Sequence, residues 1–231
     1  MAAIPLNQEI DYPTTDGQPM AETTLHRRIM SNMIEGLERR FRDVEDVWVG
    51  GNLFFYFEKG NPRAVVAPDV LLVHGVSKWD RPIYKLWEEG RAPSLVMEIT
   101  SSSTKDEDLK DKKDIYRRLG VEEYFLFDPY GDYLEPQLQG YRLESGWYVP
   151  MSPEPDGSLV SRTVDLLLRT EGERLRLVDP ETGRPLPWGE EEAEAREAAE
   201  ARAAEEAAMR KAAEERIRLL EEELARLRTQ R

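Results

Sequence analysis

The stretch Pro93–Pro129 constrains the fold most, because it has the pattern of a strand, a capped helix and a second strand. Thr104 and Glu107 have the spacing of a capping box, in which each side chain satisfies a free backbone N–H group at the start of a helix. Gly120 suits the residue just past the end of a helix, since glycine adopts a positive φ without strain. The stretch therefore predicts a helix that joins two strands.

The predicted helix carries a lysine at the centre of its apolar face. At about 100° per residue, one face of the helix collects large side chains, and these are Leu109, Ile115, Tyr116 and Leu119. Lys112 lies near the middle of this face and Asp108 lies one turn before it, whereas Lys113 lies at the edge. A buried lysine costs free energy unless an anion meets it, so we expect an acid on the strand that the helix packs against.

Glu98 is the acid that meets this expectation. Along a strand, successive side chains point to opposite faces, so Glu98 shares a face with Val96 and Thr100. Glu98 thus lies in the middle of a predicted strand among apolar neighbours. This stretch leaves two interpretations open, a structural ion pair between Glu98 and Lys112 or a part of a functional site.

A second acid, Asp69, lies in another apolar run. Residues 65–73 predict a strand, and Pro68 marks an edge, a bulge or a bend in it. No helical pattern begins at Asp69, which disfavours a capping role. Two carboxylates from neighbouring strands can hold a divalent ion, and a lysine beside them can stabilise a developing oxyanion. Asp69, Glu98 and Lys112 therefore form a candidate site for phosphodiester hydrolysis.

Composition limits the kind of metal site. The chain has no cysteine, which excludes thiolate ligands, and its two histidines, His26 and His74, are too few for a histidine-rich zinc site. A metal would be held by carboxylates, which suits Mg²⁺ or Mn²⁺. We interpret His26 as a packed or partly exposed histidine. The net charge of −14 argues against a strongly basic surface for nucleic acid.

The 231 residues suit one sizeable domain with an appendage. Residues 1–20 predict an extended arm, and residues 21–185 predict the folded domain, in which Gly50-Gly51-Asn52 has the pattern of a hairpin turn. Residues 189–231 are rich in Ala, Glu and Arg and predict a long helix. Coiled-coil spacing in it predicts a homodimer, with a lone solvated helix as the alternative; the residues at this spacing are Ile217, Leu220, Leu224 and Leu227.

The N-terminal sequence lacks the basic and apolar regions of a signal peptide. No apolar run approaches the roughly 20 residues that a membrane span requires. These two features predict a soluble, cytoplasmic protein that has no membrane partner.

Several short motifs occur together in the chain. They are Pro68-Asp69, Glu98-Ile99-Thr100, Asp108 and Lys112 with Tyr116, Gly120-Val121, and Glu123-Tyr124 through Asp128-Pro129. Over roughly residues 12–178 this combination resembles the Uma-two-type endonucleases of the PD-(D/E)xK restriction-endonuclease-like superfamily. The resemblance implies an α/β (α+β) fold with a mixed β-sheet flanked by helices. It also implies Mg²⁺-dependent cleavage of DNA.

The resemblance assigns roles to individual residues. Asp69 and Glu98 would be the acids that bind the metal, and the backbone carbonyl of Ile99 would be a further ligand. Thr100 stands where the motif has its lysine; the family places that lysine on the next helix, where Lys112 fits better than Lys113. Asp108 would orient Lys112 or contact the metal. The alternative is a non-catalytic, dimeric interaction protein that retains the nuclease fold.

Overall fold

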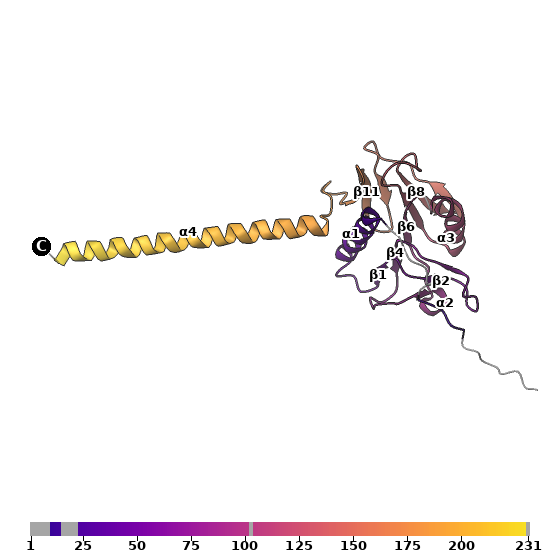
Figure 1. Ribbon diagram of the computed structural model, residues 1–231, viewed down its shortest axis with the longest axis horizontal. Helices are drawn as coiled ribbons and strands as arrows, with labels where there is room; N and C mark the ends of the chain where they lie inside the picture. The colour runs from indigo at the N-terminus through magenta and orange to yellow at the C-terminus, as the bar shows by residue number, and fades with distance from the viewer. Residues whose placement is uncertain (1–9, 15–22, 102–103, 230–231) are drawn as a thin grey trace, which may run out of the picture. The chain divides into compact units, whose positions relative to one another are not determined.

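A mixed six-stranded sheet organises the chain (Figure 1). Its strands are, in spatial order, β1 (Val47–Gly50), β4 (Val70–His74), β6 (Leu95–Ile99), β7 (Glu123–Phe127), β8 (Leu138–Glu144) and β9 (Trp147–Pro150). Strands β6 and β7 are parallel, and the other neighbouring pairs in this sheet are antiparallel. A parallel pair requires a crossover connection, which the predicted helix supplies. All five residues of β6 are buried, as expected for a central strand covered on both faces.

The computed structural model describes residues 10–14, 23–101 and 104–229. The chain divides into two compact units between Leu186 and Pro187. The first unit also holds two three-stranded sheets, one of β3 (Val65–Val66), β2 (Phe55–Tyr56) and β5 (Tyr84–Lys85), the other of β10 (Leu159–Ser161), β11 (Leu166–Glu171) and β12 (Arg174–Val178). Its helical elements are α1 (Thr24–Arg40), α2 (Leu86–Glu89), η1 (Glu107–Lys112) and α3 (Lys113–Leu119).

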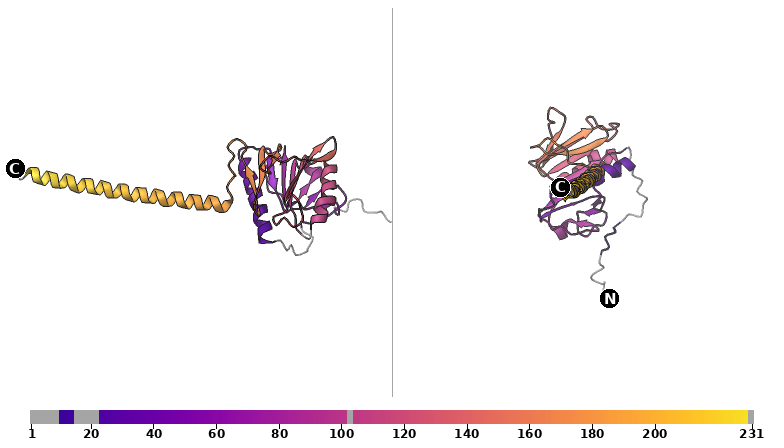
Figure 2. Two further views of the ribbon diagram at one scale, coloured as in Figure 1. Left: turned by 90° about the horizontal axis from the view of Figure 1, so that it is seen from above. Right: turned by 90° about the vertical axis from the view of Figure 1, so that its left-hand side faces the viewer.

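Helices cover both faces of the central sheet, and Figure 2 (left) shows α1 and α3 on opposite sides of its strands. Helix α1 begins after Thr23, whose side chain accepts a hydrogen bond from the backbone N–H of His26. The buried face of α1 repeats at the spacing of a helix and consists of Ile29, Met30, Met33, Gly36 and Leu37. On the opposite face of the sheet, Tyr116 packs with Val96 and Tyr124. The predicted fold class, a mixed sheet flanked by helices, is confirmed.

The crossover helix differs from the prediction in its first half. Residues Glu107–Lys112 form a π-helix, which is wider than an α-helix. The predicted capping box is wrong, because Thr104 Oγ1 accepts from the backbone N–H of Ser101 and no side chain caps η1. The buried stripe of η1 and α3 consists of Asp108, Lys112 and Tyr116, spaced by four residues. The predicted apolar positions beside this stripe are only partly buried, so the most deeply covered side chains of the helix are polar.

The predicted N-terminal arm falls mostly on residues 1–9 and 15–20, which lie outside the described residues. The short piece that is described contacts β2 and α2. The ring of Tyr12 lies 5.0 Å from the rings of both Tyr56 and Trp87, and the Tyr56 hydroxyl donates a hydrogen bond to Pro13 O. Residues 10–14 are therefore held against the smaller sheet that contains β2.

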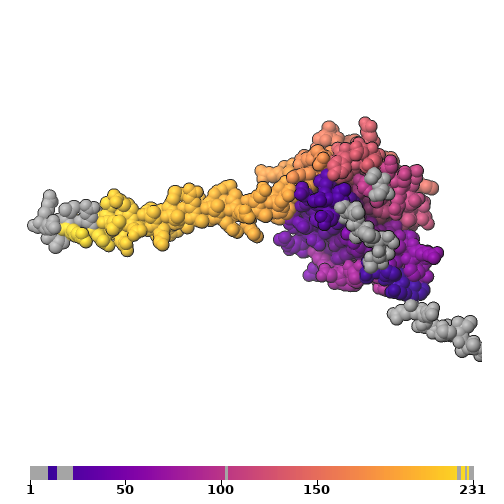
Figure 3. Space-filling view, viewed as in Figure 1, coloured from indigo at the N-terminus to yellow at the C-terminus, as the bar shows by residue number. Residues whose placement is uncertain are grey.

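The second unit consists mainly of α4 (Gly189–Thr229), a helix of 41 residues. This confirms the predicted long helix, and Figure 3 shows its side chains (orange to yellow) projecting around the helix. Ile217 and Leu220 of the predicted coiled-coil seam are exposed, while the side chains of Leu224 and Leu227 lie outside the described residues. Within the described ranges, no helix combines the length and apolar character needed to cross a membrane.

Candidate active site

Asp69 and Glu98 lie close together where the inner strand β4 begins and its neighbour β6 ends. Strands β4 and β6 are antiparallel and pair Val70 with Met97, so one further step of this register places Asp69 opposite Glu98. The backbone N–H of Ile99 donates a hydrogen bond to Asp69 Oδ2 at 2.6 Å. The structure thus brings together the two acids that the sequence singles out.

A bend between β3 and β4 places Asp69 beside the end of β6. The predicted strand over residues 65–73 is divided into β3 and β4, and Asp69 lies in the break beside Pro68. The predicted hairpin around Gly51 is wrong, because β1 pairs with β4 whereas β2 pairs with β3 and β5. Gly51 instead packs against the backbone of Asp69, and a Cβ atom at position 51 would lie 2.0 Å from Asp69 O. Only glycine fits at this contact, which fixes the backbone that carries the acid.

Glu98 is held by two side chains of the crossover helix. Lys112 Nζ donates to Glu98 Oε2 at 3.0 Å, and the hydroxyl of Tyr116 donates to Glu98 Oε1 at 2.7 Å. Lys112 Nζ also lies 3.0 Å from Asp108 Oδ1, which makes the lysine the centre of a buried network. The exposed fraction is 1% for Glu98 and 8% for Lys112. The predicted pair between strand and helix is therefore present, with a second acid added to it.

The network holds more carboxylates than cations. Burial raises the pKa of Glu98; Lys112 opposes this shift, and the negative charges of Asp69 and Asp108 add to it. Burial likewise raises the pKa of Asp108. Burial lowers the pKa of Lys112, but the surrounding carboxylates outweigh it and hold that pKa above its ordinary value. Three acids share one ammonium, so the repulsion between them adds to burial in raising the pKa values of Glu98 and Asp108, and a bound cation would oppose both effects.

His26 is a member of the site that the sequence did not reveal. Its Nε2 atom lies 3.0 Å from Asp69 Oδ1, and both side chains are mostly buried. His26 comes from the first turn of α1, so the contact joins residues that lie 43 positions apart in the chain. The periodicity of α1 places His26 next to the apolar face of the helix, but only the tertiary fold places it against Asp69.

Thr100 lies two residues after Glu98, on the same face of the sheet. Its backbone N–H donates to Phe127 O at 2.8 Å, which continues the ladder between β6 and β7 by one residue. The residue is 3% exposed. Its hydroxyl oxygen, Oγ1, has no hydrogen-bond partner in the part of the chain that the structure describes. A buried hydroxyl without a partner is unusual in a folded protein.

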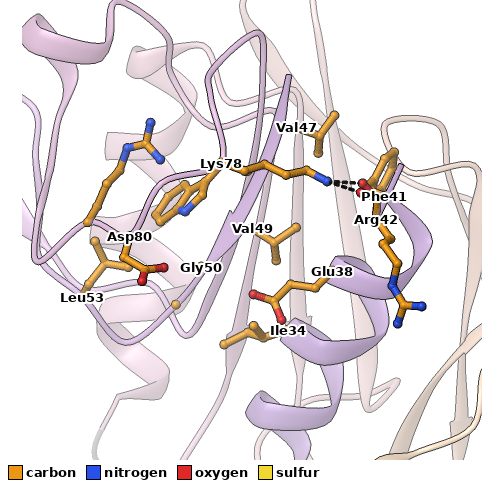
Figure 4. A pocket seen from close by; sticks show the side chains of 13 residues that line it. Ile34, Glu38, Phe41, Arg42, Val47, Val49, Gly50, Leu53, Lys78 and Asp80 are labelled. Atoms are coloured by element: carbon orange, nitrogen blue, oxygen red, sulfur yellow. Dashed lines mark hydrogen bonds between the residues drawn. The ribbon is translucent and has the colours of Figure 1, made fainter. Parts of the chain in front are cut away.

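A separate cavity of about 480 Å³ lies between the C-terminal half of α1, the edge strand β1 and residues 78–81 (Figure 4). Figure 4 shows Lys78 reaching across it to the backbone carbonyls of Phe41 and Arg42. The carboxylates of Glu38 and Asp80 also line this cavity. Asp69, Glu98 and Lys112 are not among its lining residues, so it is distinct from the candidate active site.

A central mixed sheet with helices on both faces, whose parallel strands are joined by a helical crossover, gives this chain a restriction-endonuclease-like fold. The chain belongs to the Uma2 family, described as "Putative restriction endonuclease", whose family model matches residues 1–175. This confirms the resemblance drawn from the sequence motifs.

The chain is also similar to a solved structure, a "putative nuclease belonging to DUF820" from Anabaena variabilis ATCC 29413. The two share 16% sequence identity with a TM-score of 0.46, and the match covers 65% of this chain and 81% of that chain. None of the curated proteins matches this chain.

Proposed function

We propose that this protein is an endonuclease that hydrolyses DNA phosphodiester bonds with Mg²⁺ or Mn²⁺. The observation that carries the proposal is the closeness of Asp69 to Glu98, shown by the hydrogen bond from Ile99 N to Asp69, together with the buried ammonium of Lys112 hydrogen-bonded to Glu98. Glu98 and Lys112 alone would form a structural ion pair, and Asp69 adds a second acid whose carboxylate accepts from the backbone N–H of Ile99, the residue next to Glu98. Membership of the Uma2 family supports the same class of reaction.

The donor set suits a hard divalent ion. Among the described residues, no three His, Cys, Asp or Glu side chains gather into a metal site, which disfavours a fully protein-coordinated ion such as zinc. Mg²⁺ is commonly held by one or two carboxylates and several waters, and each carboxylate oxygen can take a second contact. Asp69, Glu98 and the carbonyl of Ile99 would hold such an ion. A bound ion supplies a water of lowered pKa and offsets the charge of the phosphate.

The side chains around these acids have distinct roles in the proposal. Lys112 places a positive charge beside Glu98, where it stabilises the negative charge that develops on the phosphate oxygens. Asp108 orients Lys112 through the contact of 3.0 Å between Oδ1 and Nζ. Tyr116 orients Glu98, and His26 orients Asp69, through their hydrogen bonds.

Replacement of Asp69 by asparagine tests the proposal directly. We expect cleavage of DNA to fall by roughly 100-fold or more, because one lost carboxylate removes several kcal/mol of transition-state stabilisation. The measurement is the cleavage rate of single- and double-stranded DNA with Mg²⁺ or Mn²⁺. The matched control is Asp111→Asn, an exposed aspartate on η1, which should cleave like the wild type. Equal rates for the wild type and Asp69→Asn on every substrate would refute the nuclease.

The second candidate is a dimeric, non-catalytic interaction protein, and exposed apolar residues on α4 favour a dimer in either case. Leu220 is 43% exposed and Leu219 is 48% exposed. Titration calorimetry with MnCl₂ separates the two candidates, since a heat signal that Asp69→Asn abolishes counts against the non-catalytic one.

We expect Leu220→Glu to convert a dimer into a monomer, because it places a charge in the predicted seam of the coiled coil. Light scattering coupled to size-exclusion chromatography measures the mass. Leu219→Glu is the matched control, since Leu219 lies outside the spacing of the seam and should leave the dimer intact. A wild-type chain that elutes with the mass of a monomer at all concentrations would exclude this dimer.

A further inference from the structure

The hydroxyl of Thr100 is a buried polar group of the site that lacks a partner in the described part of the chain. Its Oγ1 atom is buried and has no hydrogen-bond partner among the described residues. Nearby groups have partners: Lys112 and Tyr116 donate to the two oxygens of Glu98, and the hydroxyl of Tyr124 donates to Asp108 O. Asp108 Oδ1 has no hydrogen bond among the described residues, but it lies 3.0 Å from the ammonium of Lys112. Thr100 therefore lies beside a hydrogen-bonded network without joining it.

The position of Thr100 relative to Glu98 follows from the strand. Residues two apart on a strand share a face and lie about 7 Å apart along it. The hydrogen bond from Thr100 N to Phe127 O keeps Thr100 in the extended ladder, so its side chain points to the face that carries Glu98. Ile99, between them, donates its N–H to Asp69. The hydroxyl thus lies on the Glu98 face of β6, one residue beyond the backbone N–H that binds Asp69.

A buried hydroxyl that lacks a protein partner is normally satisfied by water or by a ligand. Valine has nearly the shape of threonine and would fill this position without an unpaired polar group. The hydroxyl can both donate and accept a hydrogen bond, which suits a water molecule. A site that hydrolyses phosphodiester bonds must position the water molecule that attacks the phosphate.

We infer that Thr100 Oγ1 holds the attacking water of the hydrolysis through a hydrogen bond, an inference that rests on the proposed nuclease function. In that reaction the water oxygen bonds to phosphorus, and the bond from phosphorus to the leaving oxygen breaks. One proton of the water passes to solvent, and the leaving oxygen takes a proton from solvent. Thr100 neither gains nor loses a proton; it fixes where the water lies before it attacks.

The variants Thr100→Val and Thr100→Ser test this inference. We expect Thr100→Val to lower kcat by about tenfold with KM unchanged, because one hydrogen bond to the reacting water is lost. Its Tm should change by less than about 2 °C, because valine has nearly the shape of threonine and the lost partner is a water molecule. Thr100→Ser keeps the hydroxyl and should restore kcat. The matched control is Thr163→Val, whose hydroxyl donates to Glu123 Oε2 at 2.7 Å, so its Tm should fall while kcat stays constant.

The outcomes separate this inference from the proposed function. If the wild type cleaves DNA and Thr100→Val cleaves equally fast, the inference is wrong and the nuclease stands. A lower Tm for Thr100→Val, with no recovery of kcat in Thr100→Ser, shows a structural hydroxyl and overturns the inference. If the wild type cleaves no DNA, the nuclease fails and the role in hydrolysis fails with it. A high-resolution crystal structure gives a readout without activity: a water on Thr100 Oγ1 supports the inference, and its absence overturns it.

Discussion

Replacing Lys112 with methionine is expected to reduce DNA cleavage by at least about 100-fold and to lower the free energy of unfolding by roughly 3–5 kcal/mol. Methionine keeps an unbranched apolar chain of similar reach but removes the ammonium. Glu98 and Asp108 are then left buried without the cation that lies 3.0 Å from each of them. Cleavage assays give the first effect, and urea unfolding followed by circular dichroism gives the second.

The neighbouring lysine provides the control. Lys113 lies at the edge of the helical face, with its Nζ atom 3.3 Å from the centre of the Tyr141 ring, and it contacts no acid of the site. Lys113→Met loses this cation–π contact, which is worth about 0.5–1 kcal/mol, and should cleave DNA like the wild type. Equal cleavage by the two methionine variants would contradict the role proposed for Lys112.

The loss of stability in Lys112→Met should depend on pH. The folded-state pKa of Glu98 already lies above its ordinary value because of burial, and removal of Lys112 raises it further. An acid with a raised folded-state pKa binds more protons in the folded than in the unfolded protein. Its contribution to stability is therefore present at low pH and is lost as the pH rises from the unfolded pKa towards the folded one. We expect Lys112→Met to be less destabilised at pH 5 than at pH 8.

The sequence contains enough information to predict the core of the candidate site. Glu98 is an acid in an apolar strand, and Lys112 is a cation on an apolar helical face, so each is anomalous in its own local pattern. Each anomaly makes the other more plausible, because a buried charge requires a partner. The structure pairs the two across the crossover connection between β6 and β7. Asp69 was identified in the same way, by its place in an apolar run.

The parts that the sequence missed depend on contacts between distant segments or on local backbone geometry. His26 meets Asp69 only because α1 packs beside the bend before β4, and no periodicity encodes that contact. The glycines around Gly51 have the pattern of a hairpin turn. In the structure, Gly51 is needed because a side chain there would collide with Asp69 O. A periodicity of 3.6 residues also assumes a regular helix. The π-helix Glu107–Lys112 departs from it, which explains why the buried stripe is more polar than predicted.

Glu98 and Glu123 are both buried glutamates on adjacent strands, yet their surroundings indicate different roles. The pKa of Glu123 is lowered: burial would raise it, but hydrogen bonds from Ser161, the backbone N–H of Arg162, Thr163 and Arg142 outweigh burial. Four residues donate to its carboxylate, and among the described residues two, Lys112 and Tyr116, donate to that of Glu98, so hydrogen bonds outweigh burial at Glu123 but not at Glu98. Glu123 pairs with Leu95, at the opposite end of β6 from Ile99. Its carboxylate joins the central sheet to the sheet that contains β10 and β11.

Glu123→Gln should therefore lower the free energy of unfolding by roughly 3–5 kcal/mol at pH 7, because the amide leaves Arg142 without its anion and cannot accept from every donor. An acid with a lowered folded-state pKa stabilises the protein above its unfolded pKa and loses this contribution as the pH falls through the folded pKa. The gap between wild type and variant should thus shrink at acidic pH, as urea unfolding at pH 7 and near pH 3 can measure. Glu122→Gln, at the exposed neighbour, should change stability little at either pH. Rate constants for cleavage, corrected for the folded fraction, should remain those of the wild type in Glu123→Gln, and a large fall would mean that this carboxylate also serves the site.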